Sequence, residues 1–350
     1  MNFHDQPRIL ISRMSAIGDT ILTLPLLCAL RDRFPRAHIS WVVEERAAPI
    51  VDGHADLDRL IILERLWFTS PLRLLRAKKR LDPYPFDISI DPQSRLKTSI
   101  AGWLSGAKMR IGFGGKFGEE CSTLFNNRRV PPRTTHLVDR TLELLRPLGI
   151  EQPEVKFRLP IPDSAMETMD RVIDGLGVSD GFVVINPGAG WDSRLWPAER
   201  YSEVAKHVAN KHGLPSVVSW AGPREEKWAE QIVAGSSGQA VMPPATSLMH
   251  LAALMQKGSL YIGSDTGPMH MAVAVETPVI CLHGTTRPQD SGPYGTGHIP
   301  IQKRYHGGTS RQRRRACNDA MQLITAEQVC QASDTILNRP DKTVRPRWAA

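Results

Sequence analysis

The sequence has no long apolar run. None of its 350 residues lies in a stretch that approaches the ~20 consecutive apolar residues of a membrane-crossing helix. Near the start, Asp5 and Pro7 stand where a secretory signal would have an uninterrupted apolar segment. These features predict a cytoplasmic protein without a membrane span.

Cysteine is scarce and shows no pattern. The five cysteines are odd in number and scattered, and none forms a CxxC pair, which argues against both a disulfide framework and a zinc site. They are Cys28, Cys121, Cys281, Cys317 and Cys330. Ordinary free thiols are expected.

The chain also lacks the GxGxxG segment with which an NAD-dependent oxidoreductase binds its cofactor, and it contains no recognised nucleic-acid-binding module. Its formal net charge is nevertheless +8, which favours an anionic partner: nucleic acid, an acidic membrane surface or a phosphorylated substrate. The densest cationic run, residues 311–315, has no interleaved aromatic residues. This run is either a solvated loop or a phosphate-contacting one.

Apolar runs and helical spacing alternate along the whole chain. The first half predicts a helix over 19–34 and strands at 8–12, 39–43, 60–63 and 86–90. The second half predicts strands at 182–186, 216–219, 259–263 and 279–283. Helices are expected between them, from Pro197, at 225–233, at 247–255 and from Gly267.

Two proline-bearing segments, 146–147 and 158–162, separate these series. Short strands alternating with helices predict an α/β fold of two Rossmann-like, doubly wound domains facing a central cleft. The predicted parts are residues 1–165, 166–335 and a C-terminal tail of 336–350. Because such sheets bind ligands at the carboxyl ends of their strands, function is expected in the strand-to-helix loops.

The first of these loops, residues 12–20, ends at Asp19 beside the flexible Gly18. Its position allows two interpretations. Asp19 could be an N-cap that accepts hydrogen bonds from free helix amides. It could instead be a general base at the edge of the cleft.

Three loops of the second half carry phosphate-binding features. In residues 185–197, glycines permit a close backbone approach, and Arg194 could bind phosphate bidentately. In residues 263–270, Thr266 and Pro268 are typical of a helix start whose amides suit a pyrophosphate. Residues 283–288, with 292–295, should line the same rim.

Asp56-Leu57-Asp58 matches the DxD signature with which some glycosyltransferases hold a divalent metal. It precedes the strand at 60–63, on the side away from the ligand edge of a doubly wound sheet. We therefore interpret it as surface charge and predict no metal.

Seven motifs occur in order: SAIGDTILTLP, FDISIDPQSRLKTS, RIGF, THLVDR, NPGAGWDSRLWP, DTGPMH and LHGTTRPQDSGPYG. In this combination, over roughly residues 8–335, the chain resembles the ADP-heptose:lipopolysaccharide heptosyltransferases of glycosyltransferase family 9. The resemblance implies a GT-B architecture with an N-terminal acceptor domain and a C-terminal ADP-heptose domain. It also implies inverting transfer that needs neither metal nor cofactor.

The resemblance also implies roles for individual residues. The general base of the family falls on Asp19. Donor binding is expected from Asn186, Gly188, Arg194, Asp265, Thr266, Gly267 and His270. Acceptor binding is expected from Ser15, Gly18, Arg95, Lys97 and His136. Arg194 stands where the family usually has lysine, and Ser94 where it often has glycine.

The implied partners are ADP-heptose and an anionic lipid A-type acceptor, either Kdo-lipid A or heptosyl-Kdo-lipid A, with no nucleic acid. The basic balance fits peripheral association with the cytoplasmic face of the inner membrane. A family 9 transferase with a protein or another glycan as acceptor remains an alternative. From other classes, an NAD-dependent oxidoreductase and a basic nucleic-acid-binding protein remain.

Overall fold

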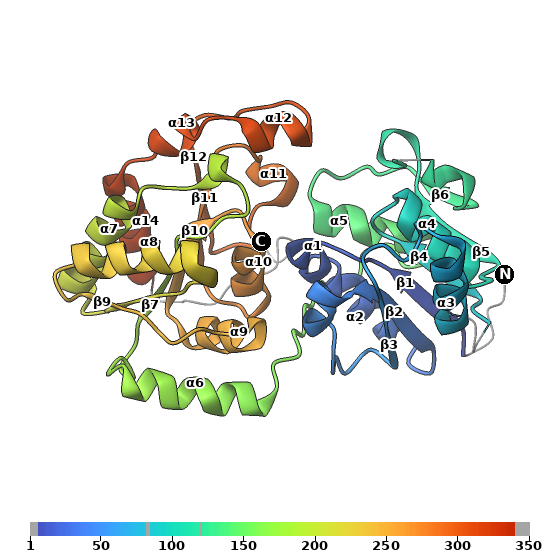
Figure 1. The fold of residues 1–350 in the computed structure, drawn as a ribbon, viewed down its shortest axis with the longest axis horizontal. Coiled ribbons are helices and arrows are strands. Elements are labelled where there is room, and N and C mark those ends of the chain that lie inside the picture. The colour runs from blue at the N-terminus through green and yellow to red at the C-terminus, as the bar shows by residue number, and fades with distance from the viewer. Residues whose placement is uncertain (1–5, 82–84, 120, 340–350) are drawn as a thin grey trace. The chain divides into compact units, whose positions relative to one another are not determined.

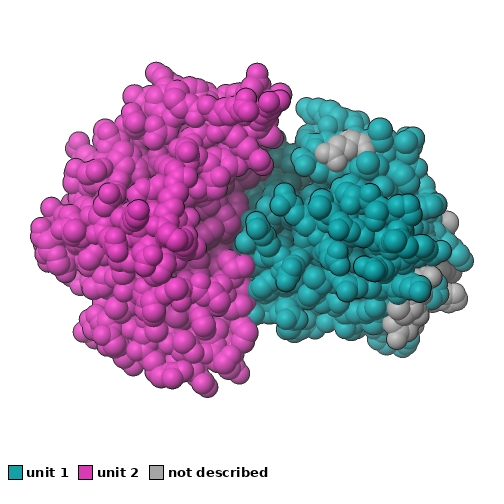
Figure 2. Space-filling model, in the orientation of Figure 1, with its two compact units in different colours: residues 1–160 teal, residues 161–350 magenta. Residues whose placement is uncertain are grey.

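The computed structural model describes residues 6–81, 85–119 and 121–339. The chain forms two compact units, residues 1–160 and 161–350 (Figure 2). The division falls inside the proline-bearing segment 158–162. Residue 165, the predicted boundary, lies within helix α6 (Asp163–Gly175), which opens unit 2.

Unit 1 is built on a parallel six-stranded sheet of order β3-β2-β1-β4-β5-β6 (Figure 1). Its strands are β1 (Arg8–Ser12), β2 (His38–Glu44), β3 (Arg59–Leu63), β4 (Ile88–Asp91), β5 (Met109–Phe113) and β6 (Arg128–Val130). The order reverses between β1 and β4, so the loops after these two strands flank the position where doubly wound sheets bind ligands.

The helices of unit 1 are α1 (Ile17–Ile21), α2 (Leu24–Arg33), α3 (Pro71–Leu81), α4 (Leu96–Leu104) and α5 (Leu137–Leu142). The single helix predicted over 19–34 is therefore wrong, since the structure has two. Pro25, in the first turn of α2, has no amide hydrogen to continue the bonding pattern of α1. The break separates the short helix that carries Asp19 from the buried helix α2.

The second unit repeats the doubly wound plan with the order β12-β11-β10-β7-β8-β9, again with parallel neighbours. Its strands are β7 (Val183–Asn186), β8 (Ser216–Val218), β9 (Ala240–Val241), β10 (Leu260–Ser264), β11 (Val279–His283) and β12 (Ile299–Gln302). The reversal here lies between β7 and β10. The predicted α/β class with two Rossmann-like sheets is confirmed.

After α6, the helices of unit 2 are α7 (Ala198–His212), α8 (Gly222–Gly235), α9 (Leu248–Lys257), α10 (Gly267–Ala274), α11 (Pro288–Ser291), α12 (Ser310–Arg315), α13 (Asp319–Gln322) and α14 (Ala326–Leu337). The cationic run 311–315 is thus part of a short helix and not a loop. The predicted tail begins inside α14, and its residues from 340 on lie outside the described part of the chain.

Each unit has its own core. In unit 1, Leu10 and Val42 of the sheet pack with Ala77 of α3 and Ala101 of α4, so these two helices cover the same face. In unit 2, strand residues such as Ile185 and Ile262 pack with α7 and α14. Fully buried aliphatic side chains contribute about 1.5–3 kcal/mol each, which makes both sheets rigid supports for the loops at their edges. Among the described residues, no helix is long and apolar enough to cross a membrane.

Candidate active site

Asp19 occupies the third position of α1, just beyond the carboxyl end of β1. Its Oδ2 accepts a hydrogen bond from the Ala16 amide (3.3 Å) and lies 2.7 Å from Nη2 of the buried Arg13. Ala16 is the N-cap, so the N-cap interpretation of Asp19 is wrong: the carboxylate supports the helix start from within the first turn. The side chain is 43% exposed, and Oδ1 has no hydrogen-bond partner among the described residues.

Lys97, in the first turn of α4, lies beside the same loop. Its Nζ is 2.6 Å from Glu44 Oε1 and 3.2 Å from Ser15 Oγ. The predicted residues Ser15, Gly18, Asp19 and Lys97 are thus brought to one edge of the sheet. Glu44, the last residue of β2, was not predicted, and its contact with Lys97 spans 53 positions of sequence.

The other two predicted acceptor residues have different surroundings. Arg95 is the N-cap residue of α4 and pairs with Glu119 at 3.0 Å, with both side chains about half exposed. His136 is only 2% exposed. Its Nδ1 accepts a hydrogen bond from the Val138 amide (3.2 Å), so the ring caps α5. This capping role was not predicted for His136.

Asp91 ends β4 and is fully buried at the same edge. Its carboxylate accepts hydrogen bonds from the Ser94 amide (2.7 Å) and from Asn126 Nδ2 (3.1 Å). Burial raises the pKa of Asp91 to about 6, although these hydrogen bonds oppose the shift. Ser94 has a φ of 48°, in the region that favours glycine, which accounts for the glycine often found there in the resembling family.

In unit 2, Arg194 lies over the edge of the sheet and contacts Asp265. Its Nη1 donates to the Asp265 carbonyl oxygen (2.5 Å) and is 3.8 Å from the carboxylate. Its guanidinium stacks 4.0 Å from the ring centre of Trp191, which Arg314 and Arg313 approach at 5.1 and 6.0 Å. Burial lowers the pKa of Arg194, and Asp265 opposes that shift.

The Asp265 carboxylate is the centre of this arrangement. Burial acts to raise its pKa, but the hydrogen bond from His270 and the positive charge of Arg194 outweigh that effect and hold the pKa below its usual range. His270 Nε2 lies 3.5 Å from Asp265 Oδ1. Burial lowers the pKa of His283 to about 4, so this ring is neutral at physiological pH.

Several buried polar atoms around Asp265 have no hydrogen-bond partner among the described residues. They are Arg194 Nε, His270 Nδ1, His283 Nε2, Thr285 Oγ1 and Arg313 Nε. Arg313 belongs to the same network because its Nη1 donates to the Thr285 carbonyl (3.3 Å). Buried polar groups normally find partners, and the two guanidinium nitrogens among these atoms can only donate, so this group of unpaired atoms indicates a site for a ligand that supplies acceptors.

Helix α10 begins at the same place. Thr266 is its N-cap residue and Pro268 lies in its first turn, as predicted. The Thr266 side chain makes no capping bond and instead donates to Ser264 O (3.3 Å). Pro268 has no amide hydrogen, and the Met269 and His270 amides donate to Thr266 O (3.1 and 3.4 Å). The Gly267 amide is therefore the one that can meet an anion at the positive end of the helix.

The remaining predicted donor residues lie around the end of β7. Asn186 is 4% exposed and donates from Nδ2 to Ser219 Oγ (3.0 Å). Gly188 faces Glu225: a Cβ at this glycine would lie 2.3 Å from the carboxylate. Burial raises the pKa of Glu225, while its bond from the Ala221 amide opposes the shift. Glu225 follows β8 and was not predicted.

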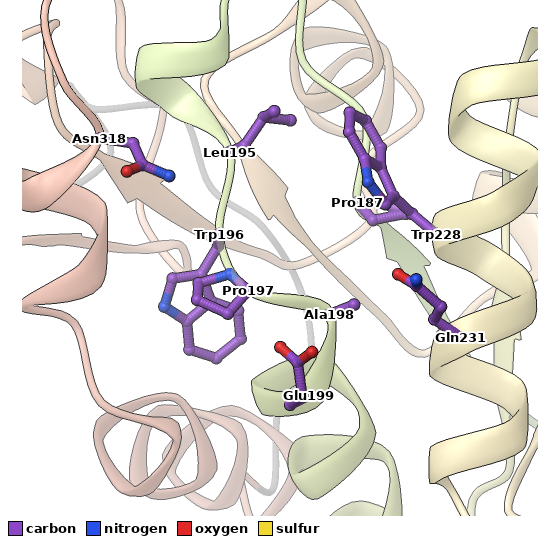
Figure 3. A pocket seen from close by; sticks show the side chains of 9 residues that line it. All are labelled: Pro187, Leu195, Trp196, Pro197, Ala198, Glu199, Trp228, Gln231 and Asn318. Atoms are coloured by element: carbon purple, nitrogen blue, oxygen red, sulfur yellow. The ribbon is translucent and has the colours of Figure 1, made fainter.

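A pocket of about 240 Å³ lies beside the loop that carries Arg194 (Figure 3). It is lined by Pro187, Leu195, Trp196, Pro197, Ala198, Glu199, Trp228, Gln231 and Asn318. Figure 3 shows Trp228 and Gln231 projecting from α8 and Glu199 from α7. None of the predicted donor residues lines this pocket, so it adjoins the Asp265 network without forming part of it.

The DxD segment is not simple surface charge, and that interpretation is wrong for Asp56. Asp56 is 7% exposed and pairs with Arg158 at 2.7 Å, whereas the half-exposed Asp58 pairs with Arg31 at 2.6 Å. Both carboxylates thus serve unit 1 as partners of arginine.

Three clusters in the described part of the chain have metal-ligand chemistry. They are Cys28, His54 and Asp56; His207, His212 and Asp334; and His306, Cys317 and Asp319. In every cluster the carboxylate already pairs with a cation, namely Arg158, Lys211 and Arg304. A metal ion at any of them would have to overcome that positive charge.

Comparison with known families gives the assignment. A model described as glycosyltransferase family 9 (heptosyltransferase) matches residues 74–320. The chain belongs to glycosyltransferase family 9. The resemblance inferred from the sequence motifs is thereby confirmed, and the protein is a glycosyltransferase of the heptosyltransferase family.

Curated relatives within family 9 match most of the chain. Lipopolysaccharide heptosyltransferase 1 of Salmonella typhimurium is 29% identical over 308 residues, which cover 83% of this chain and 93% of the relative. Lipopolysaccharide core heptosyltransferase OpsX of Haemophilus influenzae is 28% identical over 297 residues, with 83% of each chain covered.

Known structures extend the likeness to the fold. A family 9 glycosyltransferase from Veillonella parvula matches with a TM-score of 0.77 at 22% identity, covering 95% of this chain and 97% of the other. E. coli heptosyltransferase WaaC with ADP matches with a TM-score of 0.72 at 24% identity, covering 94% and 97%. The predicted GT-B architecture is confirmed.

Proposed function

We propose that this family 9 enzyme is an inverting heptosyltransferase that moves a heptose from ADP-heptose to the inner core of lipopolysaccharide, on Kdo-lipid A or heptosyl-Kdo-lipid A. The observation that carries the proposal is the group of unpaired buried donors around Asp265 at the start of α10. Curated relatives named as lipopolysaccharide heptosyltransferases support it.

The donor diphosphate is assigned to unit 2. Arg194 supplies positive charge, and Arg194, His270 and the Gly267 amide at the start of α10 supply hydrogen-bonding groups for the oxygens of a diphosphate. Arg313, stacked toward the same Trp191 ring, adds a second guanidinium. Glu225 beside Gly188 suits the hydroxyls of a ribose, as acidic residues do in other Rossmann-like sheets.

Transfer needs a base for the acceptor and charge stabilisation for the leaving ADP. Asp19 takes the acceptor hydroxyl proton on Oδ1 while Arg13 and the Ala16 amide hold Oδ2. The hydroxyl oxygen bonds to the anomeric carbon from the face opposite ADP, so the configuration inverts. The bond from the anomeric carbon to the phosphate oxygen breaks, and ADP leaves with that electron pair.

With the leaving ADP stabilised by Arg194, His270 and the N-terminal end of α10, no step needs a divalent ion. We propose metal-independent catalysis on this basis. The acceptor is assigned to unit 1, with Ser15, Gly18 and Lys97 near Asp19, Arg95 at the N-cap of α4 and His136 acting through its cap on α5. Because this acceptor is anionic and linked to lipid, we propose that the enzyme acts at the cytoplasmic face of the inner membrane.

The experiment is to incubate the protein with ADP-heptose and defined lipid A acceptors, with and without excess chelator, and to follow ADP release and product mass. Turnover on Kdo-lipid A alone would indicate addition of the first heptose, and turnover only on the heptosylated form the second. Activity lost in chelator and restored by magnesium would contradict metal independence. Turnover only on a protein or another glycan would contradict the acceptor assignment.

A further inference from the structure

Unit 1 exposes a concentration of large apolar side chains on one group of elements. Of the large hydrophobic residues that are exposed in the described chain, four lie on α3, on α4 or on the 3-10 helix Ser122–Leu124: Leu72 (71%), Leu75 (56%), Trp103 (54%) and Leu124 (77%). Single exposed leucines are ordinary, but a cluster of this kind marks an interaction surface.

Two of these side chains, Leu75 and Trp103, line a groove of about 280 Å³ between α3 and α4. Leu74, Leu75 and Lys78 line it from α3, and Ile100, Trp103 and Leu104 line it from α4. Phe125 also lines it, with its ring edge-on to Trp103 at 6.0 Å between ring centres. The groove is almost entirely apolar in lining and open to the surface, because Leu75 and Trp103 are more than half exposed.

The helix on one side of the groove is strongly basic. Residues 71–81 contain Arg73, Arg76, Lys78, Lys79 and Arg80 and no acidic residue. All five cations are exposed. A helix that combines exposed leucines with a high density of cations is typical of one that lies in the interface of an anionic membrane, where tryptophan is also favoured.

We propose that the groove between α3 and α4, with its basic helix, is the surface by which unit 1 docks on an anionic phospholipid bilayer. The inference rests on the proposed function, since a lipid-linked acceptor must be met at a membrane. Charge complementarity selects this occupant: five cations on eleven residues match an anionic leaflet. Leu72, Leu75 and Trp103 enter the interface, and the cations contact lipid headgroups.

The position of α4 connects this surface to the proposed acceptor site. Lys97 in its first turn contacts Ser15 at the edge of the sheet, and Trp103 lies six residues later on the same helix. At 1.5 Å per residue this separation is about 9 Å along the axis. Docking through Trp103 therefore holds the acceptor-side residues within a short distance of the lipid headgroups.

The test measures co-sedimentation of the full chain with phosphatidylcholine vesicles, with and without phosphatidylglycerol. We expect binding only to the anionic vesicles. Lys78→Glu with Lys79→Glu should weaken it by at least about 25-fold, since each cation near the surface is worth a factor of about five. Leu72→Gln with Leu75→Gln should weaken it about tenfold or more, and both leucines are exposed, so the fold should be kept.

Matched controls come from unit 2: Leu323→Gln, an exposed leucine, and Arg171→Glu with Lys227→Glu, two exposed helix cations. The controls should bind vesicles as the parent does. Absence of binding to anionic vesicles, or unchanged binding by either test pair, would overturn the proposal. The parent protein could instead self-associate and not bind vesicles, with the double leucine variant abolishing the self-association. That result would assign the groove to a second copy of the chain and would also overturn the proposal.

The same variants separate this proposal from the proposed function. With a deacylated, water-soluble acceptor they should release ADP at the parental rate, and with a vesicle-embedded acceptor they should be slower. A parent protein that binds anionic vesicles but releases no ADP with any acceptor would leave the surface standing and refute heptosyl transfer. A parent protein that releases ADP with the soluble acceptor but does not bind vesicles would support heptosyl transfer and refute the docking surface.

Discussion

The carboxyl edges of the two sheets differ in how their charged side chains are paired. In unit 1, three carboxylates near the edge each pair with one cation: Asp19 with Arg13, Glu44 with Lys97 and Glu119 with Arg95. In unit 2, a single buried carboxylate, Asp265, is surrounded by more donors than it can satisfy. Matched pairs fix side chains in position, whereas surplus buried donors indicate where a ligand supplies the missing charge.

The largest expected effect is a loss of turnover when Asp19 of unit 1 is substituted. Asp19→Asn should lower turnover by about 10²–10⁴-fold, because the amide cannot accept the acceptor proton. ADP affinity should stay near the parental value, since the donor is assigned to unit 2. Steady-state ADP release and calorimetry with ADP measure the two quantities. Asp52→Asn, an exposed acid of the same unit, is the control.

A role in helix support alone predicts a different result for Asp19. Asparagine can still accept from the Ala16 amide, so turnover would then stay close to normal and only the melting temperature would fall. Retention of more than about a tenth of the parental turnover at saturating substrates would refute the base assignment.

One buried group in each unit, Asp91 and His298, should make stability respond oppositely to pH. Asp91 has a raised pKa of about 6 in the fold against 3.8 when unfolded, so its contribution is complete below pH 3.8 and is lost as pH rises through 6. The loss is up to about 3 kcal/mol for this fully buried group. Asp91→Asn should remove that slope from unit 1. Hydrogen exchange of unit 1 peptides at pH 4 to 7 measures it, and an unchanged slope would contradict the prediction.

His298 gives the contrasting case in unit 2. Burial lowers its pKa to about 4 from 6.5, so unit 2 should lose stability as pH falls from 6.5 toward 4. His298→Asn keeps an acceptor for the Val279 amide and should flatten that loss in unit 2 peptides only. Equal changes in both units would contradict a local origin.

Arg194 tests the surplus of donors in unit 2. Arg194→Ala should weaken ADP binding about 10–100-fold, the usual range for a charge-assisted hydrogen bond to phosphate. Arg194→Lys should recover part of the loss, since it keeps the charge but not the planar stack on Trp191. Calorimetry with ADP measures all three proteins. Arg315→Ala, at the exposed end of α12, should bind ADP normally; equal affinity of Arg194→Ala would refute the site.

A smaller effect, about tenfold in ADP affinity, is expected for Gly267→Val, because a branched side chain at the first residue of α10 hinders approach to its amides. The control is Gly175→Val at the end of α6, where an added Cβ meets open space. Unchanged ADP affinity in Gly267→Val would remove α10 from the donor site.

Sequence reasoning located most strands because their apolar runs are short and clearly bounded. It missed β5, β6, β9 and β12, where charge, brevity or proline hides the pattern: Arg128 and Arg129 form most of β6, and Pro300 interrupts β12. Strand β12 tolerates this proline because it lies at the edge of the sheet and pairs only with β11.

The site was predictable to the extent that it follows single loops. Asp265, Thr266 and His270 share one motif, and the structure brings Arg194 to them. Other contacts at the two sheet edges were not predictable, since those of Arg13 with Pro92 and of Arg313 with Trp191 depend on how distant loops meet. Composition alone does not contain that information.

Helix α10 has one more consequence, for the time course of catalysis. Residues 269–274 are all buried, so the helix cannot fray and its first turn is in place before any ligand arrives. If the proposed diphosphate site is preformed, a ligand binds there without the entropic cost of ordering the backbone. The product ADP carries the same diphosphate as the donor, so the site also holds the product. Release of ADP, and not bond cleavage, should then be the rate-limiting step of turnover. Added ADP should act as a competitive inhibitor against the sugar nucleotide.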